Sequence, residues 1–341
     1  MFCTKNMKIH KLEKLENILP LNAPLVIMLE PTNRCTFKCA FCPTGDLGLL
    51  AKTPRRPLGD MSLKLFKKII DDLDDFAPSI IKRVQLFKDG ESLLHPDIIE
   101  MIEYTKKSKI IQEVDVTTNA SLVDDEMASK LIESKIDTIR VSFEGSVDNE
   151  MYKKITKTDY SYDSIKENFY RLYRARKKKN LTKPYLEAKV IDTGFSQEKL
   201  DKFYNDFNGI ADEITVDPLV DRKKLTGKII KGQKELIENQ VCSVPFYNLT
   251  INHDGSVSVC CVDWNYTTLV GDLNEMSVYD IWHGDKMYDF RKMHVMGEAG
   301  KHELCKKCDY MRRLPAASNI DKLALEKTDY LLNRDIKNIP K

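Results

Sequence analysis

Short apolar runs alternate with amphipathic helical patterns along the first two thirds of this 341-residue chain. Between the runs, apolar residues recur at helical spacing, as Leu63, Phe66 and Ile70 do. Strands joined by helices pair in parallel, because a crossover of that length returns the chain to the same edge of the sheet. Six such strands predict an α/β fold, a partial TIM-like (β/α)6 barrel. The expected strands span residues 25–30, 81–87, 113–118, 138–143, 185–191 and 213–216, and the expected helices span 62–76, 96–107, 124–134, 162–178 and 197–207.

The overall charge is nearly balanced, since 54 basic and 52 acidic side chains leave a net charge of +2. Such a chain has no global field to attract a polyanion, so nucleic acid is not an expected partner. No uncharged apolar run is long enough to span a membrane, and the first 16 residues lack the apolar core of a signal peptide. We therefore expect a soluble, cytoplasmic protein whose nine cysteines stay reduced.

Three cysteines follow the first expected strand, with three residues between Cys35 and Cys39 and two between Cys39 and Cys42. A cubane iron-sulfur cluster has four iron corners, so three thiolates leave one iron open to a substrate or cofactor. A zinc ion would need a fourth ligand to close its tetrahedron. Scattered buried thiols are the other alternative. The spacing favours a cluster over both.

Polar motifs follow the next strands, at the carboxyl ends where parallel sheets gather their functional groups. The second strand runs into a glycine-rich loop, and the third and fourth end in hydroxyl, amide and carboxylate side chains. Each segment alone is equally consistent with a solvated turn or a polar strand end. The candidate binding residues are Gly90, Glu91, Thr118, Asn119, Ser142, Glu144 and Lys189.

The cysteine triplet, with Phe41 before its last member, resembles the signature of the radical S-adenosylmethionine (radical SAM) enzymes, which makes Phe41 a further candidate for binding the cofactor. The resemblance implies that SAM chelates the open iron and that an electron from the cluster cleaves SAM to a 5'-deoxyadenosyl radical. The loop over residues 88–96 resembles the family's glycine-glycine-glutamate-proline motif, in which the backbone and Glu91 hold the amino group of SAM. Asp89 replaces the usual glycine here and Ser92 replaces the usual proline.

The later strand ends extend the resemblance. Thr118 and Asn119 are similar to the family's threonine-asparagine-glycine turn. Ser142 and Glu144 are similar to its serine and acidic pair near the ribose, with glutamate in place of the more common aspartate. Lys189 would point into the barrel toward the carboxylate of SAM.

Beyond residue 236 the alternation stops, and two alternating runs flank an Asp-Gly turn at residues 254–255, which is a strong hairpin signal. Four more cysteines here resemble the shortened "twitch" form of the SPASM extension of radical SAM enzymes, which implies one closed auxiliary [4Fe-4S] cluster. A four-cysteine zinc site is the alternative. We expect a leader (1–24), a radical SAM core (25–235) and an auxiliary cluster domain with a tail (236–341). The implied cluster ligands are Cys242, Cys260, Cys305 and Cys308.

Two residues beside the hairpin are candidates for chemistry. Cys261 is a packed thiol, a substitute ligand or a hydrogen-atom donor that faces the substrate. Asp263 is either a general base for a substrate hydroxyl or a loop carboxylate. His283 and His294 lie among aromatic and methionine residues, which favours packing or helix-end roles over metal ligation.

The resemblance implies an oxidoreductase with two [4Fe-4S] clusters and SAM, which oxidises a sugar-like or cyclitol-like alcohol by two electrons. A reductant such as flavodoxin or ferredoxin would supply the first electron. Epimerisation with Cys261 as hydrogen donor is the alternative within the family. Peptide modification is another, although the motif at residue 35 leaves no room for the leader-binding domain of many such enzymes. A zinc-binding protein without catalysis is the alternative from a different class.

Overall fold

The computed structural model describes residues 14–221, 223, 228–231, 240–308, 310 and 314–332. Residues 1–13 of the expected leader lie outside this part of the chain. None of the helices in the described part is long and apolar enough to cross a membrane.

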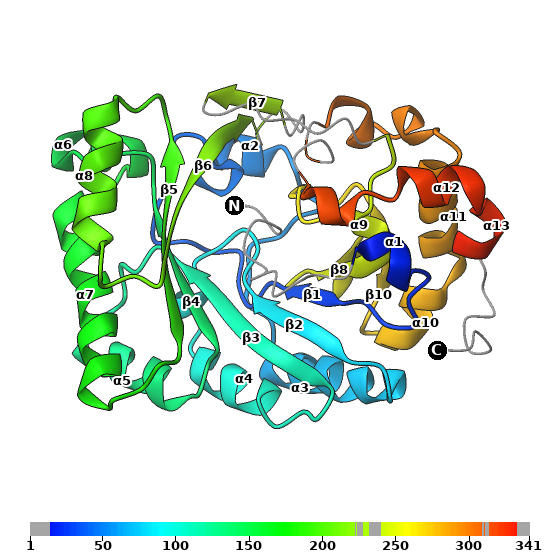
Figure 1. Ribbon diagram of the computed structural model, residues 1–341, viewed down its shortest axis with the longest axis horizontal. Coiled ribbons are helices and arrows are strands. Elements are labelled where there is room, and N and C mark those ends of the chain that lie inside the picture. The colour runs from blue at the N-terminus through cyan, green and yellow to red at the C-terminus, as the bar shows by residue number, and fades with distance from the viewer. Residues whose placement is uncertain are drawn as a thin grey trace.

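A single sheet of ten strands runs through the molecule in the order β10-β9-β8-β1-β2-β3-β4-β5-β6-β7. Strands β1 to β6 pair in parallel and in sequence order, as the alternation of strands and helices predicts. They curve around a central space in Figure 1, which confirms the expected partial barrel. Their bounds are β1 Val26–Leu29, β2 Ile81–Leu86, β3 Ile111–Thr118, β4 Thr138–Phe143, β5 Tyr185–Asp192 and β6 Glu213–Asp221.

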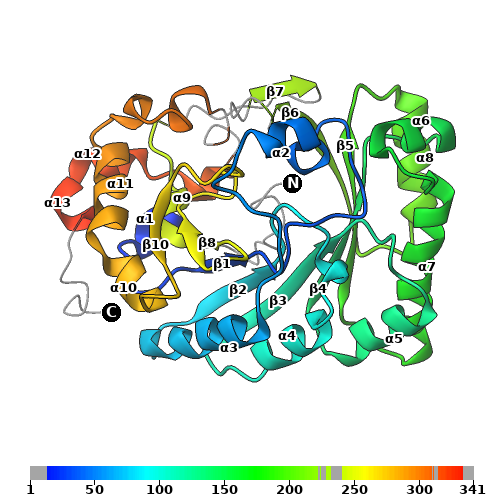
Figure 2. The same ribbon diagram turned by 180° about the vertical axis from the view of Figure 1, so that it is seen from behind.

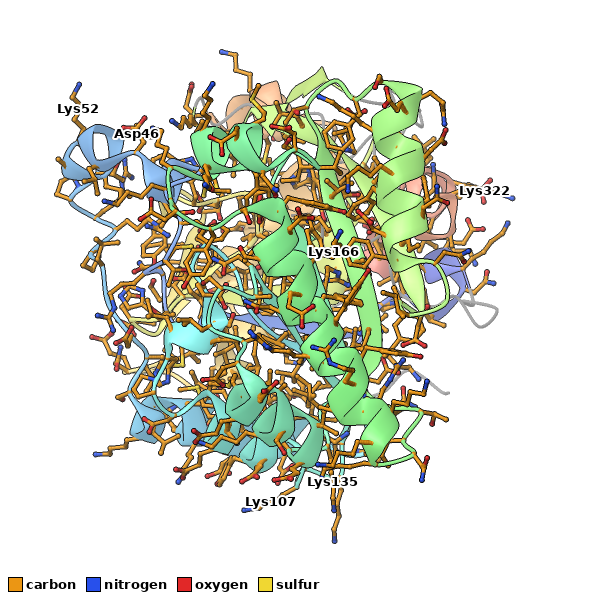
Figure 3. All side chains as sticks on the ribbon, turned by 90° about the vertical axis from the view of Figure 1, so that its left-hand side faces the viewer. Asp46, Lys52, Lys107, Lys135, Lys166 and Lys322 are labelled. Atoms are coloured by element: carbon orange, nitrogen blue, oxygen red, sulfur yellow. The ribbon has the colours of Figure 1, made fainter. Side chains whose placement is uncertain are left out.

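Helices cover the outer face of the barrel in Figure 1. Several begin at a side chain that accepts a hydrogen bond from a backbone amide of the first turn, as Ser62, Asp124 and Ser196 do. In Figure 3, which looks onto α7 and α8, Lys107 and Lys135 lie near one end of the strands and Asp46 and Lys52 near the other. The helices that follow the first five strands are α3 Leu63–Asp72, α4 Ile98–Thr105, α5 Asp125–Glu133, α7 Tyr162–Lys178 and α8 Gln197–Phe207.

Several short elements were not predicted. Helix α6 (Asn149–Thr156) follows β4 and buries Tyr152 and Thr156, and helix α2 (Leu47–Ala51) follows the cysteine triplet. Strand β7 (Lys228–Lys231) closes the far edge by antiparallel pairing with β6. Short 3-10 turns span Pro43–Gly45, Ser92–Leu94, Ala299–Lys301, Cys305–Lys307 and Ala316–Ser318. The last four residues of the helix predicted over 62–76 form a further 3-10 turn, Leu73–Phe76.

The two faces of the barrel strands differ in chemistry. Because side chains alternate along a strand, apolar residues such as Val84, Val114 and Ile139 join the hydrophobic core beneath the helices. The intervening residues are polar and buried inside the barrel. They include Arg83, Gln85, Asp115, Thr117, Arg140, Ser142, Glu187 and Lys189.

A buried ion pair crosses this interior. Arg140 Nε donates to Glu187 Oε2 at 2.7 Å, and its Nη1 lies 3.9 Å from Asp115 Oδ2. Thr215 donates to the other oxygen of Glu187. This group supports the layer that carries Ser142 and Lys189, one step closer to the carboxyl ends of the strands.

The C-terminal region continues the same sheet. Strand β8 (Asn248–Ile251) pairs in parallel with β1, and β9 (Ser256–Ser258) turns back against β8, which confirms the hairpin. Gly255 has a φ of +91°, a conformation that favours glycine. The hairpin is shorter than the sequence pattern indicates, because β9 ends at Ser258. Strand β10 (Leu269–Asp272) pairs antiparallel with β9.

A second hydrophobic core lies on the C-terminal side. It includes Leu15 and Leu19 of the leader, Val26 and Met28 of β1, and Leu314 of the tail. Figure 2 shows its helices gathered on one side of the molecule, away from α5, α7 and α8. Its helices are α1 Leu15–Ile18, α9 Val244–Tyr247, α12 Asp321–Glu326 and α13 Thr328–Leu331. Helix α10 (Val278–His283) packs into the first core, and α11 (Asp285–Val295) contributes Met287 to the first core and Val295 to the second.

Replacing Arg140 with Met tests the buried ion pair. The change should lower the free energy of unfolding by about 3–5 kcal/mol, because it leaves two buried carboxylates without their cation. Urea unfolding followed by far-UV circular dichroism measures the loss. Arg174→Met is the control, since Arg174 pairs with Glu167 on the exposed face of α7, where an ion pair contributes about 0–1 kcal/mol. Equal losses in the two variants would contradict this role for Arg140.

Candidate functional site: two cysteine centres joined by a buried charged group

The cysteine loop follows β1 and is fastened to a helix that sequence reasoning missed. Lys38 and Ala40 donate backbone hydrogen bonds of 2.9 Å and 2.8 Å to the carbonyls of Thr156 and Ile155, at the end of α6. A side chain at Gly45 would lie 2.7 Å from the carbonyl of Cys39. The cysteine loop is therefore fixed by backbone hydrogen bonds to α6 and by close packing of its own backbone at Gly45.

Cys35, Cys39 and Cys42 line a cavity at the carboxyl ends of the barrel strands, with an empty volume of about 770 Å³. The structure brings all the predicted SAM-binding residues to this one cavity. They come from the loops and strands between β1 and β5, and Pro218, Leu219 and Val220 of β6 complete the wall. The predicted residues that line it are Phe41, Gly90, Glu91, Thr118, Asn119, Ser142, Glu144 and Lys189.

Glu91 fixes the shape of the loop after β2. Its Oε1 accepts hydrogen bonds from the amide of Leu93 at 3.0 Å and from the hydroxyl of Thr118 at 2.6 Å. Its Oε2 accepts one from the amide of Asn119 at 2.6 Å. Burial raises the pKa of Glu91 to about 6, against these hydrogen bonds, which lower it. An ionised carboxylate has about four acceptor sites, so these three hydrogen bonds leave about one of them unfilled.

The departures from the family motif have clear structural consequences. Ser92 donates its hydroxyl to the carbonyl of Leu86 at 2.7 Å, which closes the loop where the motif has proline. Asp89 is buried and ion-paired, with Oδ2 at 3.6 Å from Lys88 Nζ and 3.5 Å from Arg56 Nη2. The loop therefore carries buried charge at a position where glycine would carry none.

Lys88, Asp89, Arg56 and Glu30 form a buried charged group behind the cavity. Arg56 Nη2 lies 3.7 Å from Glu30 Oε1, and the side chains of all four residues are fully buried. Two members, Lys88 and Asp89, also line the cavity. The Lys88-Asp89 pair in a glycine-type loop was a usable sequence signal, whereas nothing in the sequence marked Arg56 or Glu30.

Lys88 connects the cavity with the C-terminal hairpin. Its Nζ donates to Asn252 Oδ1 at 2.6 Å and to the backbone carbonyl of Asp263 at 3.0 Å. The same ammonium lies 4.9 Å from the centre of the Tyr266 ring, within range of a cation–π interaction. A positive charge is therefore held between the SAM-type cavity and the loop that follows Cys260.

The first cysteine centre has the properties of a cluster site. Burial raises the pKa of the Cys35 and Cys39 thiols, and binding to iron would convert them to thiolates. The Cys35 sulfur accepts hydrogen bonds from the amide of Phe37 at 3.4 Å and the side chain of Asn119 at 3.7 Å. Donors of this kind stabilise the negative charge of cluster sulfurs.

The second centre brings together all four C-terminal cysteines. Cys242, Cys260, Cys305 and Cys308 line one cavity with an empty volume of about 450 Å³. Among the residues that the structure describes, no three His, Cys, Asp or Glu side chains converge closely enough to hold a single metal ion. Zinc binds its thiolates at about 2.3 Å, closer than any three of these described side chains converge, whereas the four separate iron corners of a cubane accept more widely spaced thiolates.

Cys261 and Asp263 lie outside both cavities. Cys261 is buried in the second hydrophobic core, and strand β9 ends before it, so the expected alternation of faces does not reach this residue. Asp263 is fully buried, and each of its carboxylate oxygens accepts two hydrogen bonds from Thr267 or Thr268. All of its acceptor sites are occupied, which favours the loop carboxylate over the general base.

Gly90→Ala tests whether the cavity depends on close packing of the loop after β2 against the backbone of Thr32 and Arg34. An added Cβ would lie 2.2 Å from the carbonyl of Thr32 and 2.6 Å from that of Arg34, so the loop must move away from the cysteine loop. The affinity for SAM, measured by calorimetry on anaerobically prepared protein, should fall about tenfold or more. Gly48→Ala is the control, because its nearest neighbour is a side-chain atom at 3.6 Å. Unchanged affinity in Gly90→Ala would contradict this view of the loop.

Asp263→Asn separates a structural carboxylate from a base. An amide NH2 would face backbone and hydroxyl donors, so the free energy of unfolding should fall by about 1–3 kcal/mol. Iron at the auxiliary centre should also be lost, because Asp263 shapes the loop next to Cys260. Asp272→Asn, which changes a turn carboxylate that is not fully buried, should be near neutral. Full stability and iron content with abolished turnover would instead identify Asp263 as a base.

The chain matches two family models. Residues 29–184 match the radical SAM superfamily, and residues 242–309 match SPASM, an iron-sulfur cluster-binding domain. These two ranges contain all seven predicted cluster ligands. Both matches agree with the two centres that the structure separates.

Two curated relatives differ in how much of the chain they cover. The S-adenosyl-L-methionine-dependent 2-deoxy-scyllo-inosamine dehydrogenase of Niallia circulans is 24% identical over 313 residues, which is 90% of this chain and 98% of the relative. The tungsten-containing aldehyde ferredoxin oxidoreductase cofactor-modifying protein of Pyrococcus furiosus is 30% identical over 118 residues, 35% of this chain and 30% of the relative.

Solved structures share the fold. BtrN in complex with AdoMet and 2-DOIA has a TM-score of 0.54 at 20% identity, covering 87% of this chain and 95% of BtrN. Streptococcus suis SuiB bound to precursor peptide SuiA has a TM-score of 0.62 at 17% identity, and the match covers 92% of this chain and 75% of SuiB. The chain therefore contains a radical SAM domain over residues 29–184 and a C-terminal SPASM iron-sulfur domain over residues 242–309, with S-adenosylmethionine and [4Fe-4S] clusters as its cofactors.

Proposed function

We propose that this protein is a dehydrogenase that oxidises a secondary alcohol of a small polyhydroxylated molecule, such as a cyclitol or sugar, to a ketone. One observation carries the proposal: Lys88 lines the cavity of the first cysteine centre and is hydrogen-bonded to the hairpin of the second. A substrate in that cavity would lie between a radical source and an electron acceptor. The Niallia circulans relative, a dehydrogenase that matches 90% of this chain, supports the same reaction class.

The cysteines divide the cofactors between the two centres. Cys35, Cys39 and Cys42 would hold the cluster with an open iron, and Cys242, Cys260, Cys305 and Cys308 the closed one. When bound, SAM and the first cluster supply a carbon radical that removes a hydrogen atom from the substrate, and the auxiliary cluster accepts one electron. A one-electron donor of the flavodoxin or ferredoxin class would reduce the first cluster.

The cavity residues would bind and orient SAM. Glu91 keeps one acceptor site for the amino group of SAM, and the absence of a side chain at Gly90 lets this loop pack against the backbone of Thr32 and Arg34. Ser142 and Glu144 offer a hydroxyl and a carboxylate to the ribose. Lys189, buried and 3.5 Å from Asp217, would face the carboxylate of SAM. Phe41, Thr118 and Asn119 complete the wall.

Lys88 would assist the oxidation of the alcohol. The hydroxyl proton of the substrate would pass to solvent water. The oxygen becomes negative as this proton leaves, and a fixed ammonium in a buried site stabilises such charge strongly. Two N–H groups of Lys88 are directed to Asn252 and the Asp263 carbonyl, and Asp89 offsets its charge. The cation can therefore remain buried beside the cavity whether or not the substrate is bound.

The arrangement favours oxidation over epimerisation. A hydrogen donor must reach the substrate carbon, and Cys261 lies in the second hydrophobic core outside the cavity. Its thiol contacts Cys260 by a side-chain hydrogen bond, one of the interactions that raise the pKa of Cys260. The position of Cys261 therefore fits a packed thiol beside a cluster ligand.

Isotope transfer tests the proposed reaction. The anaerobically prepared protein is given SAM, dithionite and a panel of cyclitols, aminocyclitols and hexoses deuterated at the carbinol carbons. We expect one deuterium in the 5'-deoxyadenosine and an equal amount of ketone, both measured by mass spectrometry. A full complement of about eight irons per chain is expected for two clusters. Zinc without sulfide would contradict the proposal.

Two variants make the isotope experiment specific. Replacing Cys35, Cys39 and Cys42 together with Ala should abolish SAM cleavage and leave about four irons, those of the auxiliary cluster. Cys261→Ala should oxidise its substrate at the wild-type rate. If the substrate instead returns with inverted configuration and solvent deuterium, and Cys261→Ala loses that return, the enzyme is an epimerase.

A further inference from the structure

The sulfurs of the auxiliary centre receive N–H hydrogen bonds in a regular pattern. The amide of Val262 donates to Cys260 at 3.4 Å, and the amide of Tyr310 donates to Cys308 at 3.3 Å. The amide of Val244 donates to Cys242 in the same way. In each case the donor lies two residues after the cysteine. Three of the four sulfurs thus accept a hydrogen bond from a backbone amide of the loop that follows the cysteine.

Cys305 departs from this pattern. It lies in the 3-10 turn Cys305–Lys307, where the amide of Cys308 bonds to the carbonyl of Cys305 and tightens the turn. Among the residues that the structure describes, the hydrogen-bonding partner of the Cys305 sulfur is a side-chain atom, His294 Nε2, at 3.7 Å. This side chain comes from α11, a different element of the domain.

His294 is held toward the cluster cavity rather than toward solvent. It is 2% exposed and lines the cavity together with the four cysteines. Its ring packs against Phe290, one turn earlier on α11, with the ring centres 5.4 Å apart. In the described part of the chain, Nδ1 has no hydrogen-bond partner. The sequence favoured a packing or helix-end role for His294, and the structure places it in contact with Cys305, one of the proposed cluster ligands.

We propose that His294 is a positioning residue for the auxiliary cluster: its Nε2–H donates a hydrogen bond to the Cys305 sulfur and thereby raises the reduction potential of that cluster. The inference rests on the proposed function for the presence of a [4Fe-4S] cluster at the four cysteines. Reduction adds negative charge that the ligand sulfurs share, so an N–H donor at a sulfur stabilises the reduced form more than the oxidised form. A higher potential makes the cluster a better acceptor for an electron from the substrate.

The nearby His302 provides a matched control. Its ring packs against the same Phe290 with ring centres 5.4 Å apart, but its Nε2 lies 3.4 Å from the backbone carbonyl of Thr267 and not next to a ligand sulfur. The two histidines thus pack against one aromatic ring and differ in their contact with the cluster site. Leu is close to the volume of His and removes the donor in either position.

The test measures the potential of the auxiliary cluster alone. In full-length protein with Cys35, Cys39 and Cys42 replaced by Ala, a redox titration monitored by electron paramagnetic resonance gives the midpoint. We expect His294→Leu to shift the midpoint to a lower value and His294→Gln, which keeps an N–H, to restore part of it. His302→Leu should leave the midpoint unchanged. A wild-type midpoint in His294→Leu, or an equal shift in His302→Leu, would overturn the proposal.

A measurement on protein with native His294 covers the case in which His294→Leu loses its cluster. Histidine labelled with nitrogen-15 should give a weak hyperfine coupling to the reduced auxiliary cluster, as expected for a nitrogen one hydrogen bond away from a ligand sulfur. Absent coupling, or a strong coupling from direct iron ligation, would overturn the proposal. A parent protein without any auxiliary cluster would instead refute the proposed function.

Discussion

The parallel pairing of β1 with β8 is the contact on which the rest of the structure depends. Val26–Leu29 aligns residue by residue with Asn248–Ile251, although more than 200 residues separate the two strands in the sequence. Because the strands are parallel, their carboxyl ends lie at the same edge of the sheet. The cysteine loop begins after one end and the hairpin of the second centre after the other. One ladder of hydrogen bonds therefore places both cysteine centres.

Strand β1 can make this connection because it is buried on both faces. Ile27 and Leu29 pack into the core of the barrel, and Val26 and Met28 pack into the C-terminal core. A short apolar strand in the middle of a sheet reads as a continuous hydrophobic run without polar alternation. The same run gives no indication that two different cores use its two faces.

A buried charged group lies directly beyond the ends of these two strands. Glu30 follows β1, and His253 follows β8 by two residues; the two side chains lie 3.3 Å apart. Tyr266 donates to the same carboxylate at 3.2 Å. Glu30 is a member of the buried charged group with Arg56, Lys88 and Asp89, so His253 and Tyr266 connect the C-terminal region to that group. Buried charges are costly unless they are paired, so their arrangement allows little freedom in how the C-terminal hairpin meets the barrel.

The sequence predicted the parts of the molecule that depend on local pattern. The six barrel strands, their five main helices and the hairpin follow from periodicity and an Asp-Gly turn. The pairing of β1 with β8 has no local signal, because it joins distant segments. Helix α6 was missed because it is short. Its contact with the cysteine loop is also made between distant segments, through two backbone carbonyls that accept hydrogen bonds from that loop.

The site was predictable where the residue types are specific to one chemistry. It was not predictable where the role of a side chain depends on its orientation and partners. The cysteines and the SAM-type loops line the cavities that their motifs indicate. Asp263 and His294 show the limit, because a carboxylate or an imidazole fits several roles until its partners are known. The oxygens of Asp263 accept hydrogen bonds from two threonines, whereas His294 Nε2 lies 3.7 Å from the Cys305 sulfur.

The surroundings of the two centres explain why they suit different tasks. The first opens into a cavity with Glu91, Glu144, Lys88 and Lys189 on its walls, where a charged cofactor can be bound and oriented. The second is enclosed by its four cysteines and by apolar side chains such as Val262 and Phe290. A closed cluster in apolar surroundings changes its charge without changing its ligands, and its potential is set by the N–H groups around its sulfurs. Since Lys88 reaches from the first cavity to the Asp263 carbonyl, three residues after Cys260, the polar chemistry and the electron acceptor are adjacent but separate.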